Sequence, residues 1–361
     1  MNRRSFLTTS ASGSLLLPHL LLGKKSGNSP LVIGEGVHQY EVTHDWAKLP
    51  SQYSWQTTHN LAVDQAGFVY VIHEGRKHLK EHPSIFVFDP NGKFVRAFGS
   101  QFQGGGHGIE VRKEGNEEFL YVCAYQNIKA FAKLTLTGET VWEKYAPMDS
   151  GVYRKGEDSK ESVRFEGKGR PRWGKDAFLP TNFAFLNDGG FLLADGYGSF
   201  WIHRYDKGGN WVSKFGGPGN GKGSFRTPHG IWTDRRNGEE TVVVCDRAHH
   251  TVQFLSLDGK HLQTIDGFGL PANADVWNDL LMIPELHARI SLLDKNNKVV
   301  ARLGDDVENV VTQKKVKRGN AKTWKNGKFV HPHDACFSSN GDIFVAEWVQ
   351  TGRITKLRRV S

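Results

Sequence analysis

Residues 227–267 read TPHGIWTDRRNGEETVVVCDRAHHTVQFLSLDGKHLQTIDG and contain the pattern that decides the fold. Apolar and polar residues alternate in four short runs, and NG and DG dipeptides separate the first run from the second and the third from the fourth. Alternation of this kind predicts half-buried β-strands, and these dipeptides predict hairpin turns. The stretch therefore predicts a meander of four antiparallel strands.

The same order of strands and turns recurs along the chain, most clearly in residues 58–99 and 179–216. Aligning the first strands gives six starting positions, which are His59, His107, Thr181, His229, Ala272 and His333. The intervals between them are 48, 74, 48, 43 and 61 residues. The shorter intervals are typical of the blades of a β-propeller. We therefore expect an all-β fold, a six-bladed propeller of four-stranded antiparallel blades.

Two features complete this prediction. The two long intervals contain charged stretches near residues 146–178 and 305–328, which we interpret as surface insertions. The sixth repeat ends at RITKLRRVS, one strand short, and the N-terminal segment HQYEVTHDW (38–46) is expected to supply the missing outer strand. Closing the ring in this way removes exposed sheet edges. Residues 31–361 are thus predicted to form a single propeller domain.

The composition bounds the possible partners. The chain is 38% hydrophobic and 24% charged, as in globular proteins with a packed core. Its net charge is +9, part of it in the basic run 312–328, but no nucleic-acid-binding motif accompanies this charge. We expect no nucleic acid, and instead a small-molecule or peptide substrate at the channel mouth. The sequence does not determine the oligomeric state. The cysteines, which are Cys123, Cys245 and Cys336, lie in apolar runs and are expected to be inert thiols.

The N-terminus reads MNRRSFLTTSASGSLLLPHLLLGKKS and resembles a twin-arginine export signal. Its apolar stretch is interrupted by Pro18 and His19 and is too short to cross a membrane as a helix. Residues 1–30 are therefore predicted to direct export to the periplasm or cell envelope. An uncleaved anchor is the alternative.

The histidines of the first strands point to a metal. The innermost strand of each propeller blade lines the central channel, so equivalent residues of the blades form a ring. Blades two, four and six place His107, His229 and His333 on this ring. Three histidines with an open fourth position bind a catalytic zinc ion, and the ring predicts such a site; hydrogen-bonded structural histidines are the alternative. His59 of blade one also lies on the ring, and is interpreted as a group behind the ligands, a substrate contact, or a sign that the ring is merely polar.

An acidic residue follows the second strand in the last four blades. These residues are Asp195, Asp246, Glu285 and Glu347. We expect them to accept hydrogen bonds from the backbone of nearby loops rather than to take part in catalysis. The neighbouring Tyr197 and Arg247 are better candidates for chemistry. A tyrosine has a pKa near 10, so it acts as a general base only where a cation or metal lowers that value.

With these motifs, the chain resembles the NHL-repeat six-bladed propellers and, among them, peptidyl-α-hydroxyglycine α-amidating lyase. The resemblance covers residues 40–360 and rests on ADGYG…IHRYD…GNWVSKFG, PHGIWTD…VVVCDR and HPHDACFSSNGDIFVAEW. It implies a zinc-dependent lyase that cleaves an N–Cα bond to give an amide and glyoxylate. The zinc ligands of the family fall on His107, His229 and His333. Its catalytic tyrosine falls on Tyr197, and a catalytic arginine falls on Arg247.

The resemblance also implies a structural calcium ion in the channel. The carbonyl ligands fall on Leu61 and Ile109 and the carboxylate ligand on Asp334, a set of oxygen donors that suits a hard cation. One position does not match. The family has a second arginine where VIHEGRKH (71–78) places Glu74, which opposes a carboxylate-bearing substrate. Arg76, two residues later, is the candidate for that role if the loop is shifted.

Two other functions stay open. A non-catalytic NHL propeller would bind a peptide, a glycan or a partner protein on one face, because fold does not determine function. Another propeller enzyme, such as a lactonase or a lyase of cyclic esters, would use carboxylate and asparagine ligands around calcium or magnesium. The histidine-rich ring argues against this last class.

Overall fold

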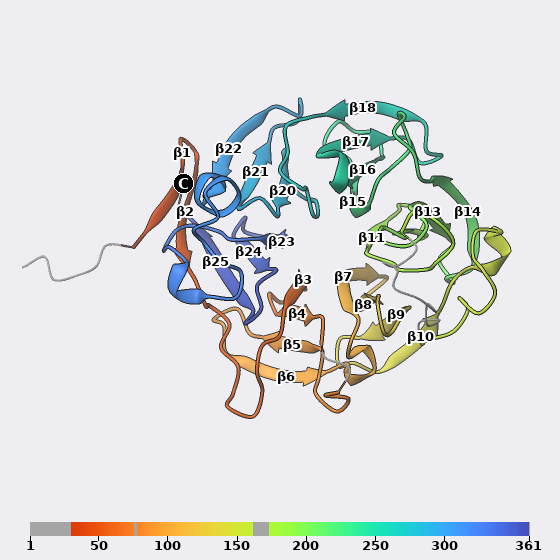
Figure 1. The fold of residues 1–361 in the computed structure, drawn as a ribbon, viewed down its shortest axis with the longest axis horizontal. Helices are drawn as coiled ribbons and strands as arrows, with labels where there is room; N and C mark the ends of the chain where they lie inside the picture. Colours follow the sequence, from red (N-terminus) through yellow and green to blue (C-terminus); the bar gives the residue numbers. More distant parts are fainter. Residues whose placement is uncertain (1–29, 76–77, 162–172, 361) are drawn as a thin grey trace, which may run out of the picture. The chain divides into compact units, whose positions relative to one another are not determined.

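The computed structural model describes residues 30–75, 78–161 and 173–360. In this part of the chain six antiparallel sheets surround a central axis (Figure 1). The predicted six-bladed β-propeller is confirmed. The twin-arginine segment and Arg76 lie outside the described residues. Among the residues that are described, no helix is long and apolar enough to span a membrane.

Each blade is a meander whose first strand is innermost. Blade one consists of β3 (Thr58–Val63), β4 (Val69–His73), β5 (Ile85–Phe88) and β6 (Phe94–Phe98). Blade two consists of β7 (Gly106–Glu114), β8 (Glu117–Ala124), β9 (Ala130–Thr135) and β10 (Thr140–Lys144). Blade three consists of β11 (Asn182–Phe185), β12 (Phe191–Ala194), β13 (Trp201–Tyr205) and β14 (Trp211–Gly216). Blade four consists of β15 (Pro228–Asp234), β16 (Thr241–Asp246), β17 (Thr251–Leu255) and β18 (His261–Ile265). Blade five consists of β19 (Asp275–Trp277), β20 (Leu280–Glu285), β21 (Arg289–Leu293) and β22 (Val299–Leu303).

Blade six joins the two ends of the propeller. It contains β23 (Pro332–Phe337), β24 (Ile343–Glu347) and β25 (Arg353–Arg359), and the N-terminal strand β2 (His38–Thr43) pairs antiparallel with β25. The predicted closure by an N-terminal strand is thus confirmed. The structure adds β1 (Val32–Glu35), which pairs with β2 and makes this sheet five-stranded.

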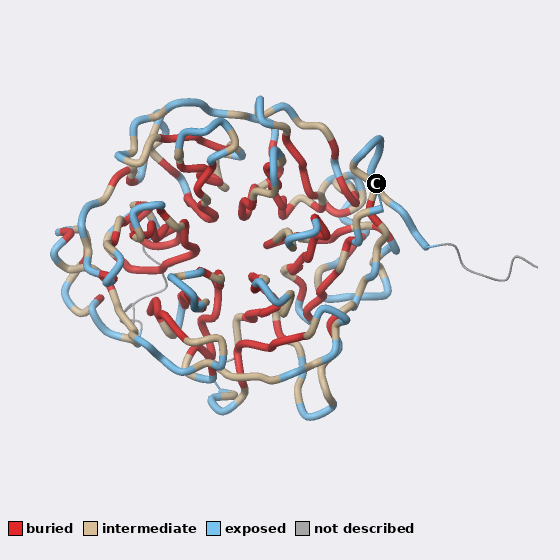
Figure 2. Tube along the Cα trace, turned by 180° about the vertical axis from the view of Figure 1, so that it is seen from behind, coloured by how far each residue is buried: buried red, intermediate tan, exposed pale blue. Residues whose placement is uncertain are grey.

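The core lies between neighbouring blades, and the buried residues gather along the inner strands (Figure 2). Ile72 and Ile85 of blade one, for example, pack in one cluster with Ile109 and Leu120 of blade two. Because both faces of a middle strand meet a neighbouring blade, β4 and β5 read as continuous apolar runs and are fully buried. Each such aliphatic or aromatic side chain contributes about 1.5–3 kcal/mol.

The glycines that follow two of the ring histidines show how closely the inner strands approach one another. A Cβ atom on Gly108 would lie 2.4 Å from the carbonyl oxygen of Thr181 in the next blade. A Cβ atom on Gly230 would lie 2.3 Å from the Cα atom of Asn273. Only glycine fits at such distances. The His-Gly pairs therefore bring each imidazole next to the backbone of the following blade.

The predicted structural role of the repeated acids is confirmed. Asp195, Asp246, Glu285 and Glu347 are buried, and each accepts a hydrogen bond from the backbone ahead of its blade's first strand. The donors are the N–H groups of Leu179, Arg226, Gly269 and Val330, respectively. The carboxylates thus fix the loops at the channel mouth.

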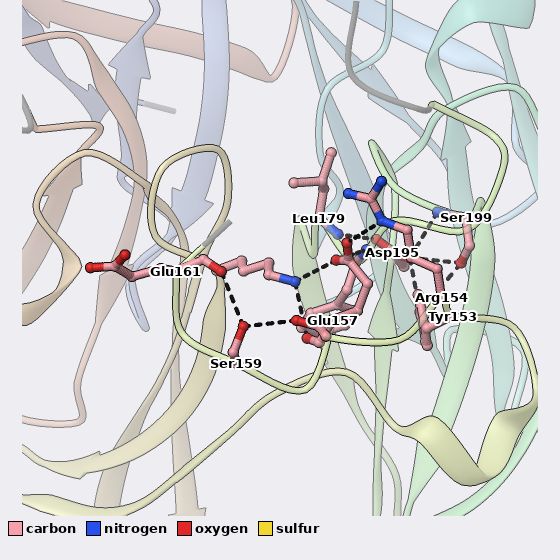
Figure 3. A network of polar contacts seen from close by, with 11 residues as sticks. Tyr153, Arg154, Glu157, Ser159, Glu161, Leu179, Asp195 and Ser199 are labelled. Atoms are coloured by element: carbon pink, nitrogen blue, oxygen red, sulfur yellow. Dashed lines mark hydrogen bonds and ion pairs between the residues drawn. The ribbon is translucent and has the colours of Figure 1, made fainter. Parts of the chain in front are cut away.

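The described parts of the two insertions are anchored by buried groups. In the first, which contains η2 (Met148–Ser150), the Tyr153 hydroxyl donates to Asp195 Oδ2 at 2.8 Å and lies 2.6 Å from His203 Nε2. Buried Glu157 forms ion pairs with Lys129 and Arg154 in the same region (Figure 3). The second insertion contains η4 (Glu308–Thr312) and η5 (Ala321–Thr323). The described residues also form the short helices η1 (Ser100–Phe102) and η3 (Arg247–His249).

The three cysteines are free thiols. Cys123 and Cys245 are buried, and Cys336 is partly exposed. Burial raises the pKa of all three thiols, as expected for inert cysteines.

Candidate metal centre at the channel mouth

Four histidine side chains meet at the axis, each from the first strand of its blade. The rings of His107, His229 and His333 lie 4.7–5.0 Å apart between centroids. His59 lies 4.8 Å from His107 and 4.7 Å from His333. All four are buried. The repeat register therefore placed the three predicted ligands, and His59 with them, in one cluster.

Hydrogen bonds orient three of these imidazoles. The Nδ1 atoms of His107, His229 and His333 lie 2.8, 2.6 and 3.1 Å from the backbone carbonyl oxygens of Thr181, Ala272 and His59, respectively. A ring that donates from Nδ1 keeps a lone pair on Nε2, which is how metal-binding histidines are held. The Nε2 atoms of His107 and His229 lie 3.1 Å apart. By contrast, both ring nitrogens of His59 are without a hydrogen-bond partner in the described part of the chain.

Burial keeps these imidazoles neutral. It lowers the pKa of His107 to about 3, and it lowers the pKa of His59, His229 and His333 well below the usual 6.5. The neighbouring imidazoles act in the same direction on His59 and His333. Neutral imidazole is the form that binds metals.

One set of three histidines in the described part of the chain has ligand atoms close enough together to hold a metal ion, and the predicted set overlaps with it. The ligand atoms of His59, His107 and His333 all lie within 4.8 Å of one another. The second set is the predicted one and contains His229 in place of His59. Proximity alone favours the first set, whereas the orienting hydrogen bond at Nδ1 favours the second. The hydrogen bonds at Nδ1 of His107, His229 and His333 leave the lone pair of each ring on Nε2, which is the arrangement of metal-binding histidines.

Tyr197 and Arg247 lie beside this cluster. The Tyr197 hydroxyl is 2.9 Å from His229 Nε2, and the Arg247 guanidinium carbon lies 4.8 Å from the centre of the tyrosine ring. Tyr197 follows Asp195 in the loop between β12 and β13, and its N–H donates to the Leu179 carbonyl. Burial raises the pKa of Tyr197 more than Arg247 lowers it. Without a metal, the phenol is therefore protonated at neutral pH.

Two further aromatic residues pack against Tyr197 and were not predicted. The Tyr125 ring stacks on it with centroids 4.8 Å apart, and the Trp173 ring lies 5.0 Å away. Trp173 is 45% exposed and belongs to the first insertion. Tyr125 follows the second strand of blade two, so extending the register to that position would have found it. Trp173 lies in an insertion outside the repeat, so the blade register could not have identified it.

Glu74 occupies the position where the resemblance to the amidating lyases implies a second arginine, and it lies beside His59. Its carboxylate is 3.9 Å from His59 Nε2. Burial raises the pKa of Glu74, while a hydrogen bond from Gln126 and the charge of Arg318 oppose that effect. Arg318 comes from the second insertion and was not predicted as a site residue. It donates to the Trp348 carbonyl at 2.8 Å and to the Thr57 hydroxyl at 3.2 Å.

A layer of oxygen atoms adjoins the histidines in the channel. Asp334 follows His333 and accepts from the Leu61 N–H at 2.9 Å and from the Asn273 amide at 2.6 Å. Asn182 bridges Asn273 and Glu110, at 2.7 and 3.3 Å. Burial and the charge of Asp334 raise the pKa of Glu110.

Some acceptors of this layer have no donor. The side-chain oxygens of Asn60 and Asn182 are buried without a hydrogen-bond partner among the described residues. Ile109 is fully buried next to Glu110. An excess of oxygen acceptors over donors fits a hard cation such as calcium. Of the predicted calcium ligands, the side chain of Asp334 lies in this layer, and its carboxylate binds the amide of Leu61.

The fold defines a six-bladed propeller, and comparison with known proteins supports no narrower family. No family model matches the chain, and no curated protein matches it in sequence. Among solved structures, a catalytically inactive variant of virginiamycin B lyase from Staphylococcus aureus, bound to quinupristin, is 14% identical with a TM-score of 0.53. The match covers 89% of this chain and 100% of that one.

A gluconolactonase from Xanthomonas campestris is 12% identical with a TM-score of 0.54, over 91% of this chain and 95% of that one. A protein of unknown function from Bacteroides thetaiotaomicron is 11% identical with a TM-score of 0.56, over 91% of this chain and 76% of that one. At these identities the likeness establishes the propeller fold alone. NHL repeats and the amidating lyase are not among these findings, so that part of the resemblance stays a prediction.

Proposed function

We propose that the protein is a zinc-dependent lyase that cleaves the N–Cα bond of a peptidyl-α-hydroxyglycine to give an amide and glyoxylate. One observation carries the proposal. Backbone carbonyls orient the clustered imidazoles of His107, His229 and His333, and the Tyr197 hydroxyl lies 2.9 Å from Nε2 of His229. A buried group of three neutral histidines with a phenol beside it suits a bound hydroxyl group that must lose its proton.

The reaction is an elimination without water. The hydroxyl proton leaves, the C–O bond becomes a carbonyl as the C–N bond breaks, and the released nitrogen takes a proton. Zinc would supply Lewis acidity toward the substrate hydroxyl. Tyr197 is assigned to take the hydroxyl proton and return one to the nitrogen.

Arg247 supports this role of Tyr197. Its guanidinium lies over the tyrosine ring and lowers the pKa of the phenol, so it stabilises negative charge on the oxygen. Tyr125 is buried and stacks on the Tyr197 ring, so it shields that charge from water. A calcium ion in the oxygen layer, beside Asp334, is assigned a structural role.

Turnover by the full chain tests the proposal. The protein is stripped of metal, reloaded with zinc and assayed for glyoxylate released from α-hydroxyhippurate. Tyr197→Phe should lower kcat by about 10²–10⁴-fold with its zinc content unchanged, because the variant lacks only the proton-transferring hydroxyl. His229→Ala should lose zinc and activity together, whereas His59→Gln should keep its zinc.

The outcomes separate the candidate functions. Stoichiometric zinc without glyoxylate release would reject this substrate. Absence of stoichiometric zinc, unchanged by His229→Ala, would favour a non-catalytic propeller that binds a peptide, a glycan or a partner protein.

The oxygen layer favours a second candidate, a metal-dependent enzyme that opens a cyclic ester. Glu110, Asp334 and the unpartnered oxygens of Asn60 and Asn182 are the carboxylate and asparagine donors that calcium or magnesium prefers. The solved lyase and lactonase propellers share the fold. Hydrolysis of a lactone that requires calcium or magnesium, and that Glu110→Gln abolishes, would support this candidate over the first.

A further inference from the structure

Two half-buried arginines flank the histidine cluster without a carboxylate partner. Within the described residues, no carboxylate oxygen lies within 4.0 Å of the guanidinium nitrogens of Arg247 or Arg318. Arg353 provides a contrast. It stacks on a tryptophan ring, as Arg318 does, but it forms an ion pair with Glu347. Glu74 acts on Arg318 through its charge, but no described carboxylate forms an ion pair with Arg318 or Arg247, so each guanidinium has lost part of its hydration without gaining a hydrogen-bonded anion.

The hydrogen-bond partners of Arg318 fix its orientation. Its Nε and Nη2 atoms donate to the Trp348 carbonyl and the Thr57 hydroxyl, and its guanidinium carbon lies 3.3 Å from the centre of the Trp348 ring. These partners are uncharged. A planar guanidinium held in this way is preorganised to bind a carboxylate.

Arg318 and Arg247 face the cluster from different sides. Arg318 is held by Thr57 of blade one and Trp348 of blade six, whereas Arg247 belongs to blade four, which lies opposite blade one in a ring of six. The backbone of Thr57 also binds the N–H of Glu74. The second insertion thus brings the positive charge of Arg318 to the part of the channel mouth where blade one contributes the negative charge of Glu74.

We propose that Arg318 anchors the carboxylate of the substrate at the mouth of the channel, across the histidine cluster from Arg247. This inference rests on the proposed function and identifies a specificity residue within it. It also assigns a function to the basic insertion. Glu74 would weaken the binding of this anion, because a like charge lies nearby. Removing Arg318 and removing the charge of Glu74 should therefore have opposite effects on anion binding.

Calorimetric titration of the zinc-loaded full chain with hippurate and its uncharged amide, hippuramide, tests the assignment. The wild type should bind hippurate more tightly. Arg318→Gln should weaken hippurate binding by about 10- to 100-fold and leave hippuramide binding unchanged, as expected for a lost charged hydrogen bond. Glu74→Gln should tighten hippurate binding. Lys322→Gln, which removes an exposed charge from the same insertion, controls for net charge.

Three results would overturn the proposal: absence of hippurate binding by the wild type, equal affinity of the wild type for hippurate and hippuramide, or wild-type affinity of Arg318→Gln for hippurate. If Arg318→Gln does not fold, Arg318→Lys replaces it, and an unchanged hippurate affinity would again refute the assignment. Binding is measured without turnover. Failure of the lyase proposal therefore appears separately, as absence of glyoxylate.

Discussion

Replacing His203 by glutamine should make the stability of the protein less sensitive to acid. His203 is fully buried, its Nδ1 accepts from the Trp211 indole N–H at 3.1 Å, and its Nε2 lies 2.6 Å from the Tyr153 hydroxyl. A neutral ring protonated on Nε2 satisfies both contacts. An imidazolium would direct a second N–H against the indole N–H. Burial, aided by the charge of Lys214, lowers the pKa of His203 from 6.5 to about 3.

The sign and size of the effect of His203 on the free energy of unfolding follow from proton linkage. Because the folded pKa lies below the unfolded one, the unfolded state binds more protons between pH 6.5 and 3, and stability falls as the pH falls through this window. With an unfolded pKa of about 6.5, His203 costs about 0.2 kcal/mol at pH 7 and about 2 kcal/mol at pH 5. Burial raises the pKa of Asp195, in the same network, to about 6, which acts in the opposite direction. That contribution is common to both proteins.

Urea unfolding of the metal-free wild type and His203→Gln at pH 7, 6 and 5 measures the difference. Glutamine can accept from Trp211 and donate to Tyr153, but it does not titrate. We therefore expect the wild type to lose about 2 kcal/mol more than the variant between pH 7 and 5. His261→Gln, on the outer strand β18, should follow the wild type. Parallel pH profiles of the wild type and His203→Gln would refute the reasoning.

Four further outcomes are expected. Glu157→Gln should lower the free energy of unfolding by about 3–5 kcal/mol, because two cations lose their shared carboxylate; unchanged urea stability would contradict this. Gly108→Ala should lower both the melting temperature and the zinc content, since its methyl group would meet a carbonyl oxygen at 2.4 Å, whereas Gly221→Ala, with no atom within 4 Å, should not. Trp173→Ala should raise KM for α-hydroxyhippurate severalfold, and equal KM values would exclude contact with the substrate. Chelation should lower the stability of the zinc-loaded protein, and zinc at a hundredfold excess over Kd should restore about 2.7 kcal/mol, as calorimetry would show.

The fold could be predicted because the sequence pattern of a blade occurs six times. Each blade carries the same alternation and the same turns, so errors in one repeat are corrected by the others. Strand β2 was predicted because blade six lacked a strand. Strand β1 was not, since its residues VIGE are largely exposed and show no buried face. Backbone hydrogen bonds to β2 hold β1 in place, and such bonds do not require any particular pattern of side chains.

The site could be predicted only where it follows the repeat. The register brought together His107, His229 and His333 from positions more than a hundred residues apart in sequence. Tyr125 obeys the same register and could have been identified. Arg318 could not, because it lies in an insertion, and long-range packing alone brings that insertion to the mouth of the channel.

The strand that closes the ring also determines when the site can form. Strand β25 of blade six pairs with β2, so two segments from distant parts of the sequence are both needed to close the ring. His333 lies in the same blade as β25, so the histidine cluster is incomplete until blade six has formed. A polypeptide that lacks blade six therefore has neither a closed ring nor all four of the clustered histidines.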